Sequence, residues 1–140
     1  MATSNVDAYE YYLRGRKLLH QHRGNYDDSI RMFTRAIELD PNYPPAYCGI
    51  ADGYAWKYMY RESTELNLQE SEKASRKAIA LAPHLAEAHA SLGLAISLKK
   101  NYNEAAREFE KAIQLDSRLF EAYYYYGRMC FAKGEYGKTA

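Results

Sequence analysis

The stretch FTRAIELDPNY at residues 33–43 decides the fold, because it occurs three times in the chain. It returns as SRKAIALAPHL at residues 75–85 and as FEKAIQLDSRL at residues 109–119, so the copies are 42 and then 34 residues apart. Self-similarity at spacings of roughly 20 to 50 residues is typical of proteins that stack one small structural unit. The sequence therefore predicts a repeat architecture whose units share one continuous core.

A second block, with a small residue near its centre, precedes each copy and also occurs once after the last. The four blocks are YYLRGRKL, YCGIADGY, HASLGLAI and YYYYGRMC, centred on Gly15, Ala51, Gly93 and Gly127. We expect each small residue to let the first helix of a unit lie close to the second. Compared with the third unit, the first carries two extra residues and the second carries eight, all between the two blocks.

Both kinds of block have the apolar periodicity of helices. Apolar residues recur three and four positions apart, as in Ile30, Phe33 and Ile37. Turn-forming residues such as Gly24-Asn25 and Asp40-Pro41-Asn42 separate the blocks. The pattern predicts an all-α chain of repeated helix–turn–helix units.

This pattern resembles the tetratricopeptide repeat (TPR) family, most clearly in the third unit. There Leu92-Gly93, Ala105, Phe109 and Ala112 fit the family's spacing, which has a period of 34 residues. The resemblance implies a right-handed α-solenoid of antiparallel helix pairs, with three full repeats and a partial fourth. We expect one domain over residues 1–140, with repeats at about 8–41, 44–83, 86–117 and 120–140. The sequence of residues 8–54 is also similar to TPR regions of bacterial multidomain signalling proteins.

The family resemblance implies a non-catalytic protein–protein interaction module that binds a peptide or protein segment in its concave groove. Aligning the first helices by their small residues predicts the groove positions. They are Tyr12, Arg16, Cys48, Asp52, Ala90, Leu94, Tyr124 and Arg128. The alternative is an oligomerisation or regulatory scaffold segment of a larger signalling protein.

Chaperone-binding members of the family hold a terminal carboxylate with Lys and Asn side chains. The matching positions here hold Tyr12, Arg16, Gly49, Glu87 and Ser91. Only Arg16 could supply a cation, so a chaperone carboxylate clamp is not expected. Arg16 and Arg128 are either solvated charges or partners for acidic groups of another ligand.

Composition excludes several classes of function. The chain has 19 basic and 18 acidic residues and a net charge of +1, which predicts neither nucleic-acid nor membrane binding. We expect a cytoplasmic protein, because the sequence shows no signal peptide or apolar span. Cys48 and Cys130 are expected to be small buried residues. His20 and His22 would diverge on a helix, so no metal site is predicted. No cofactor and no enzymatic activity are predicted either.

The eight-residue insertion lies next to an unusual second block. Ser75 replaces the ring found at Phe33 and Phe109, and we expect the insert at residues 56–63 to fold back into that space. Asn67 and Glu70 are predicted to form a capping box that restarts the helix.

Four consecutive tyrosines begin the last block, and they cannot all face one core. The phasing predicts that Tyr123 and Tyr126 pack, while Tyr124 and Tyr125 face the groove or its rim. A turn is expected at Gly134, before too few residues to form another helix. The predicted self-association face is Tyr126, Cys130 and Phe131. Either the chain is part of a longer repeat array or a homodimer covers this face.

Overall fold

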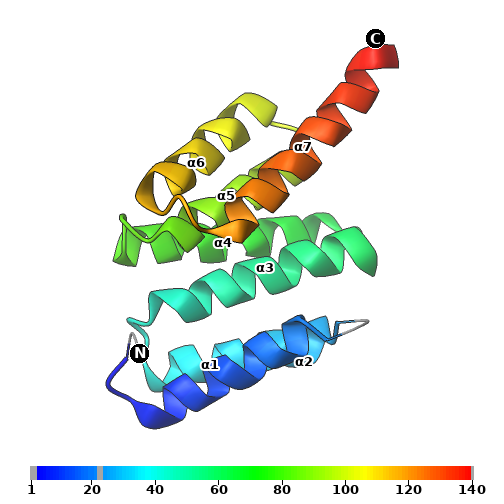
Figure 1. Cartoon of the computed structure of the whole chain (residues 1–140). Helices are drawn as coiled ribbons and strands as arrows, with labels where there is room; N and C mark the ends of the chain where they lie inside the picture. The colour runs from blue at the N-terminus through cyan, green and yellow to red at the C-terminus, as the bar shows by residue number, and fades with distance from the viewer. Residues whose placement is uncertain (1–2, 22–23, 140) are drawn as a thin grey trace.

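The computed structural model describes residues 3–21 and 24–139, with side chains described to residue 134, and every regular element in it is an α-helix. The helices are α1 (Val6–Leu19), α2 (Tyr26–Leu39), α3 (Pro44–Tyr60), α4 (Glu65–Leu81), α5 (Ala86–Leu98), α6 (Tyr102–Leu115) and α7 (Phe120–Thr139). Figure 1 shows them stacked in chain order, from α1 and α2 at one end to α6 and α7 at the other. No helix in the described ranges is both long and apolar enough to cross a membrane.

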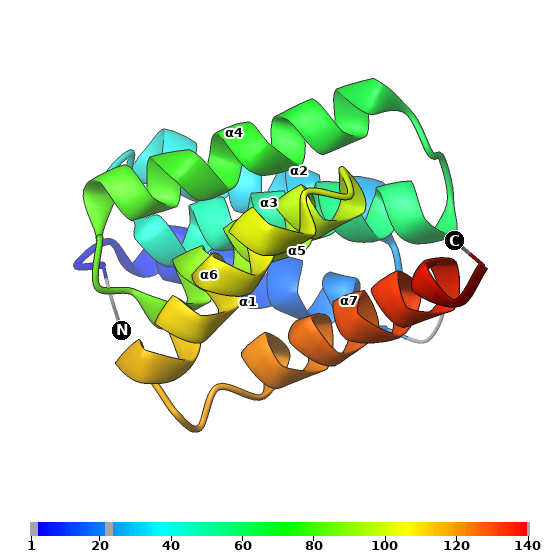
Figure 2. The same ribbon diagram turned by 90° about the horizontal axis from the view of Figure 1, so that it is seen from above.

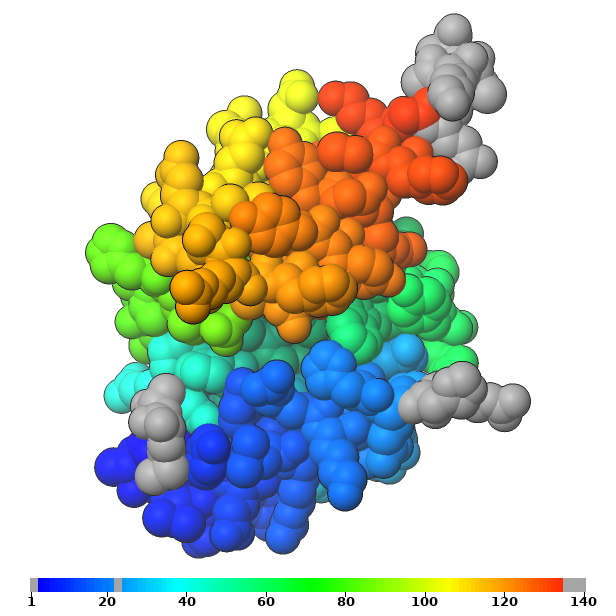
Figure 3. Space-filling model, in the orientation of Figure 1, coloured from blue at the N-terminus to red at the C-terminus, as the bar shows by residue number. Residues whose placement is uncertain are grey.

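The helices form pairs, and the pairs stack into a solenoid. Each helix from α1 to α6 contacts the next along the chain, while α1 also contacts α3, α3 contacts α5, and α5 contacts α7. Viewed from above, α4 and α7 lie on opposite sides of the stack (Figure 2). The space-filling view shows α1 and α7 on the same face of the molecule (Figure 3). The predicted all-α solenoid is therefore confirmed, and its first helices line one side.

Local sequence explains where the helices begin. The side chains of Asn5, Asn25 and Thr64 cap α1, α2 and α4 by accepting hydrogen bonds from backbone N–H groups in the first turn. Two prolines occupy the first positions of α3, where a missing N–H costs no helical hydrogen bond.

Glycine lets a phenylalanine ring sit between the helices of the first and third pairs. A methyl group on Gly15 would lie 2.7 Å from Phe33 Cε1, and one on Gly93 would lie 2.6 Å from Phe109 Cε1. Both rings are fully buried. In each of these two pairs, a buried phenylalanine ring therefore packs directly against the backbone of a glycine.

The second pair has Ser75 where the other two pairs have a phenylalanine ring, and it shares with the first pair a serine hydroxyl bonded across the two helices, there Ser29 Oγ to the Gly15 carbonyl at 2.8 Å. Ser71 Oγ donates to the Ala51 carbonyl at 2.8 Å, and Ser75 Oγ donates to the Ser71 carbonyl at 3.0 Å. Both serines are fully buried. The prediction that the insert folds back over Ser75 is wrong, because residues 56–60 of the insert continue α3 as a regular helix.

The insertion instead lengthens the second pair. Helices α3 and α4 have 17 residues each, against 14 in α1 and α2. The cap of α4 is also different from the prediction: Thr64 is the N-cap, and its Oγ1 accepts a hydrogen bond from Asn67 N at 3.3 Å. Thr64 takes this position because its extended backbone precedes the first helical turn.

The last helix departs from the sequence prediction in two ways. It continues through Gly134 to Thr139, and no glycine described has the positive φ that a turn there would favour. Tyr125 is only 2% exposed, whereas Tyr123 is 48% exposed and Tyr124 is also exposed. Tyr123 thus does not pack, and Tyr125 does. Within the described residues, no further helix covers the outer side of α7. The buried Tyr125 ring lies on its inner side, in the core around Phe109.

Candidate partner-binding groove

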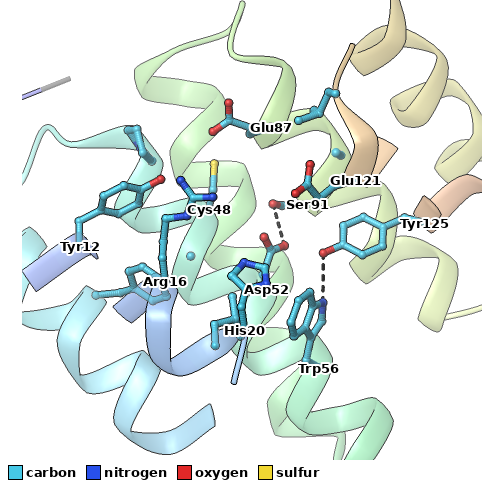
Figure 4. Close-up of a pocket in the computed structure, with 16 residues that line it drawn as sticks. Tyr12, Arg16, His20, Cys48, Asp52, Trp56, Glu87, Ser91, Glu121 and Tyr125 are labelled. Atoms are coloured by element: carbon cyan, nitrogen blue, oxygen red, sulfur yellow. Dashed lines mark hydrogen bonds between the residues drawn. The ribbon is translucent and has the colours of Figure 1, made fainter. Parts of the chain in front are cut away.

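A cavity of about 170 Å³ opens on the concave side of the solenoid. All four first helices contribute to it. The polar and aromatic side chains that line it are Tyr12, Arg16, His20, Phe33, Cys48, Asp52, Trp56, Glu87, Ser91, Glu121 and Tyr125. Figure 4 shows Asp52 near the centre, with side chains of α1 on one side and side chains of α7 on the other.

Three carboxylates belong to this cavity, and none forms an ion pair among the described residues. Ser91 Oγ donates to Asp52 Oδ1 at 2.9 Å, which fixes one of the two carboxyl oxygens. Burial raises the pKa of Asp52 to about 7, and the nearby charges of Glu121 and Glu87 act in the same direction. Burial also raises the pKa of Glu87. The cavity thus disfavours the negative charges of Asp52 and Glu87.

Aromatic side chains form the opposite part of the lining. Trp56 Nε1 donates to the Tyr125 hydroxyl at 3.1 Å, which joins α3 to α7 (Figure 4). The His20 ring meets Trp56 edge to face, with 5.3 Å between centroids. Burial lowers the pKa of His20, and the charge of Arg16 lowers it further, so the imidazole is neutral at pH 7.

Arg16 is the only charged cation in the lining. It is exposed at the α1 side of the cavity, and its guanidinium carbon lies 5.8 Å from the centroid of the Tyr12 ring. Its charge lowers the pKa of Asp52 and Glu87, but this effect is smaller than that of burial at both groups.

The structure places the predicted groove residues in three different settings. Those that line the cavity are Tyr12, Arg16, Cys48, Asp52 and Ala90. Leu94 does not, because it is 1% exposed and belongs to the core around Phe109. Tyr124 lines an adjoining hollow with Met59 and Tyr60, and this hollow shares His20, Trp56 and Tyr125 with the cavity.

The predicted position of Arg128 is also wrong for this cavity. Arg128 Nη1 lies 2.7 Å from Met59 Sδ, and its guanidinium carbon is 5.9 Å from the Tyr60 ring centroid. Both contacts are with the extension of α3 produced by the insertion. The lengthened α3 therefore contacts the side chain of Arg128, which the alignment had placed in the groove.

Lining residues that were not predicted as groove positions include Trp56 and Glu121, whereas Tyr125, expected at the groove or its rim, does line the cavity. Trp56 follows Cys48 and Asp52 at helical spacing, and this was the available signal. On α1, the lining residues Tyr12 and Arg16 lie three before and one after Gly15, whereas on α7, Glu121 and Tyr125 lie six and two before Gly127. Positions six and two before the small residue also line the cavity on α3, as Pro45 and Gly49, and on α5, as Glu87 and Ser91, so the same alignment could have found Glu121.

Two further sequence-based predictions concern the two cysteines and the absence of a metal site. Cys48 is buried, and burial raises the pKa of its thiol, whereas Cys130 is exposed on the outer side of α7 and so corrects the expectation that both are buried. His22 lies outside the described residues. Across the described ranges, no group of three or more His, Cys, Asp and Glu residues is arranged to hold a metal ion.

The predicted self-association face is only partly free. Tyr126 stacks on Phe109, with 5.4 Å between ring centroids, and its hydroxyl donates to Glu110 Oε1 at 3.0 Å. Phe131 is 76% exposed, and Cys130 is exposed beside it. No atom lies within 4 Å of where a methyl group on Gly127 would be. The exposed part of the face is thus Phe131, Cys130 and the surface around Gly127.

Comparison with known proteins identifies the repeated unit. The family model described as tetratricopeptide repeat matches residues 11–43 and 86–118. RNA polymerase II-associated protein 3 of Xenopus laevis is 31% identical over 99 residues, which are 71% of this chain and 14% of that protein. Transcriptional regulator HilA of Salmonella typhimurium (strain LT2) is 24% identical over 134 residues, which are 94% of this chain and 24% of that protein.

A solved structure confirms the architecture. The first TPR of Spaghetti (RPAP3), bound to the HSP90 peptide SRMEEVD, has a TM-score of 0.71 and 21% identity, covering 96% of this chain and 98% of that chain. At this identity the likeness shows the fold alone. The chain spans less than a quarter of the length of the curated relatives it matches.

Proposed function

Since the chain belongs to the tetratricopeptide repeat family, we propose that it is a non-catalytic protein–protein interaction module whose concave groove binds a peptide or protein segment. One observation carries this proposal: a single cavity is lined by side chains from α1, α3, α5 and α7. A segment lying there would contact all the first helices at once. Concave sites with a few convergent polar groups among aromatic side chains are common ligand sites. A place in a bacterial signalling protein stays a prediction.

We also propose that the groove is not a chaperone carboxylate clamp. A related fold has been solved with the acidic peptide SRMEEVD. In this chain, three carboxylates and one guanidinium line the cavity, so an acidic peptide terminus would meet like charges. The charge of the groove supports a different peptide chemistry.

A random-peptide display library selected against the chain tests the groove proposal. Binding of each selected peptide is then mapped by amide chemical shifts on isotopically labelled protein. Residues of α1, α3, α5 and α7 facing the cavity, including the indole N–H of Trp56, are expected to shift. Selection of no specific peptide, or shifts confined to the outer helices α2, α4 and α6, would overturn the proposal.

Self-association through α7 is the second candidate function. The favouring observation is the exposed aromatic surface of this helix, which includes Phe131, Phe120 and Tyr123. Exposed apolar surface of this kind marks many interaction sites. Under this proposal α7 joins two copies of the chain, and the concave groove remains open.

A further inference from the structure

We propose that the cavity binds a lysine or arginine side chain of a basic peptide segment, held between the carboxylates Asp52, Glu87 and Glu121 and the aromatic rings beside them. This inference rests on the proposed function of the groove and adds the chemical class of its ligand. It also differs from the sequence-based alternative in which Arg16 pairs with an acidic ligand.

The charge balance of the cavity carries the proposal. Three carboxylates and one guanidinium give the ionised lining a charge of −2, since −3 + 1 = −2, whereas the whole chain has a net charge of +1. The negative charge is thus local to the groove. A cationic side chain there would be attracted by the lining, while an anionic one would be repelled.

Partial burial makes Asp52 responsive to a ligand. Asp52 is enclosed by α1, α5 and α7, and one of its oxygens accepts a hydrogen bond from Ser91. Its Oδ2 has no hydrogen-bond partner among the described residues. Asp52 is half-buried, and a half-buried carboxylate without a counter-ion is less favourable than one in water. A bound ammonium or guanidinium would supply that counter-ion with a charge-assisted hydrogen bond.

The aromatic rings suit the same ligand. Trp56 lines the cavity between His20 and Tyr125, and Tyr12 lies at the α1 side. Aromatic faces attract ammonium and guanidinium groups, and the aliphatic stem of Lys or Arg packs well on such rings. Carboxylates together with aromatic rings therefore match both the charge and the stem of a basic side chain.

A competing structural explanation exists for two of the carboxylates. Glu87 and Glu121 lie in the first turns of α5 and α7, where negative charge is favourable to a helix. Glu65 is the matched control, because it lies exposed in the first turn of α4 and does not line the cavity. Changing Glu65 to Gln removes the same helix-end effect but leaves the groove charge intact.

The experiment uses the single tryptophan as the reporter, since Trp56 lies in the cavity. The indole N–H resonance of Trp56 is followed while blocked pentapeptides are added: GGKGG, GGRGG, the neutral norleucine analogue, and GGEGG. Saturable shifts are expected with the Lys or Arg peptide, and with neither of the others. Glu87→Gln and Glu121→Gln should each weaken binding roughly three- to fivefold, and Glu65→Gln should leave it unchanged. Arg16→Gln should strengthen it.

The outcomes separate this inference from the groove proposal. If GGEGG or the norleucine peptide binds at the groove as tightly as GGKGG and GGRGG, the groove proposal stands and the cationic ligand is wrong. If no pentapeptide shifts Trp56, the cationic inference is overturned, and the display library alone decides the groove proposal. Equal weakening by Glu65→Gln and Glu87→Gln would also overturn it, because the effect would then come from helix ends.

Discussion

Ser91 on α5 donates a hydrogen bond to Asp52 on α3, with 2.9 Å between Oγ and Oδ1, at the point where four helices surround one carboxyl group. The hydroxyl favours the ionised carboxylate, but burial opposes it more strongly and raises the pKa of Asp52 to about 7. The groups facing this carboxyl are Arg16 and His20 from α1, Glu87 and Ser91 from α5, Glu121 and Tyr125 from α7, and Cys48 on its own helix. The groove thus contains an acid that titrates near neutral pH.

Replacing Asp52 with Asn is expected to stabilise the free protein above pH 7. The folded pKa of about 7 exceeds the ordinary value of 3.8, so the folded state binds the proton more tightly, and stability is lost as the pH rises from about 4 to about 7. The full shift corresponds to at most about 4 kcal/mol, and access of water to the cavity reduces the expected gain to roughly 1–2 kcal/mol. Asn keeps an oxygen that can accept from Ser91.

Urea unfolding of wild type and Asp52→Asn at pH 4.5, 6 and 8 measures this difference. The stability gain of the variant should be near zero at the lowest pH and largest at pH 8. A gain that does not change with pH would show that Asp52 does not titrate in this range.

Binding of a basic peptide should tighten as the pH rises through 7. Only ionised Asp52 offers its full charge to the ligand, and a pKa of about 7 leaves roughly a tenth of it ionised at pH 6. Affinity for GGKGG or GGRGG, followed through Trp56, is therefore expected to be up to about tenfold higher at pH 8 than at pH 6. Asp52→Asn should bind more weakly at pH 8 and lose most of this dependence. Any pH dependence of binding that remains in the variant would come from the other titratable groups of the cavity, such as Glu87 and His20.

The fold could be predicted from the sequence because the copies at residues 33–43, 75–85 and 109–119 repeat both periodicity and turns. The cavity could be predicted only in part. Residues near the α1 end, such as Tyr12 and Asp52, were found because the alignment there matches the helix face that lines the cavity. Leu94 was misplaced because it is buried in the core around Phe109, although Ala90, one turn earlier on the same helix, does line the cavity. This burial depends on packing between helices, which the repeat pattern does not give.

Replacing Gly93 in the core and Gly127 on α7 with alanine should change the stability of the protein in opposite directions. Gly93→Ala would place its methyl group 2.6 Å from Phe109 Cε1, so a fully buried ring would have to move. We expect a loss of about 1–3 kcal/mol in the free energy of unfolding. Gly127→Ala meets no atom within 4 Å and should stabilise the helix by up to about 1 kcal/mol. Chemical denaturation of both variants checks the pair, and similar losses in both would contradict the packing of Phe109 on Gly93.

Self-association through α7 should depend on Phe131 and not on apolar exposure in general. Phe131 is 76% exposed, next to the uncovered surface at Gly127 and Cys130. Leu66 on α4 is the matched control, because it is 62% exposed and lies far along the chain from α7. Tyr126 is a poor target, since its stacking on Phe109 would make a substitution destabilising.

Sedimentation velocity over a wide concentration range tests this directly. If α7 joins two copies, the wild type should show a concentration-dependent dimer, Phe131→Ser should raise the dissociation constant at least tenfold, and Leu66→Ser should have little effect. Experiments are run with a reducing agent, because exposed Cys130 could otherwise form a disulfide between copies. A monomer at every concentration, or a dimer that Phe131→Ser leaves intact, would exclude this face as the site of self-association. The concave groove would then be the interaction surface to pursue.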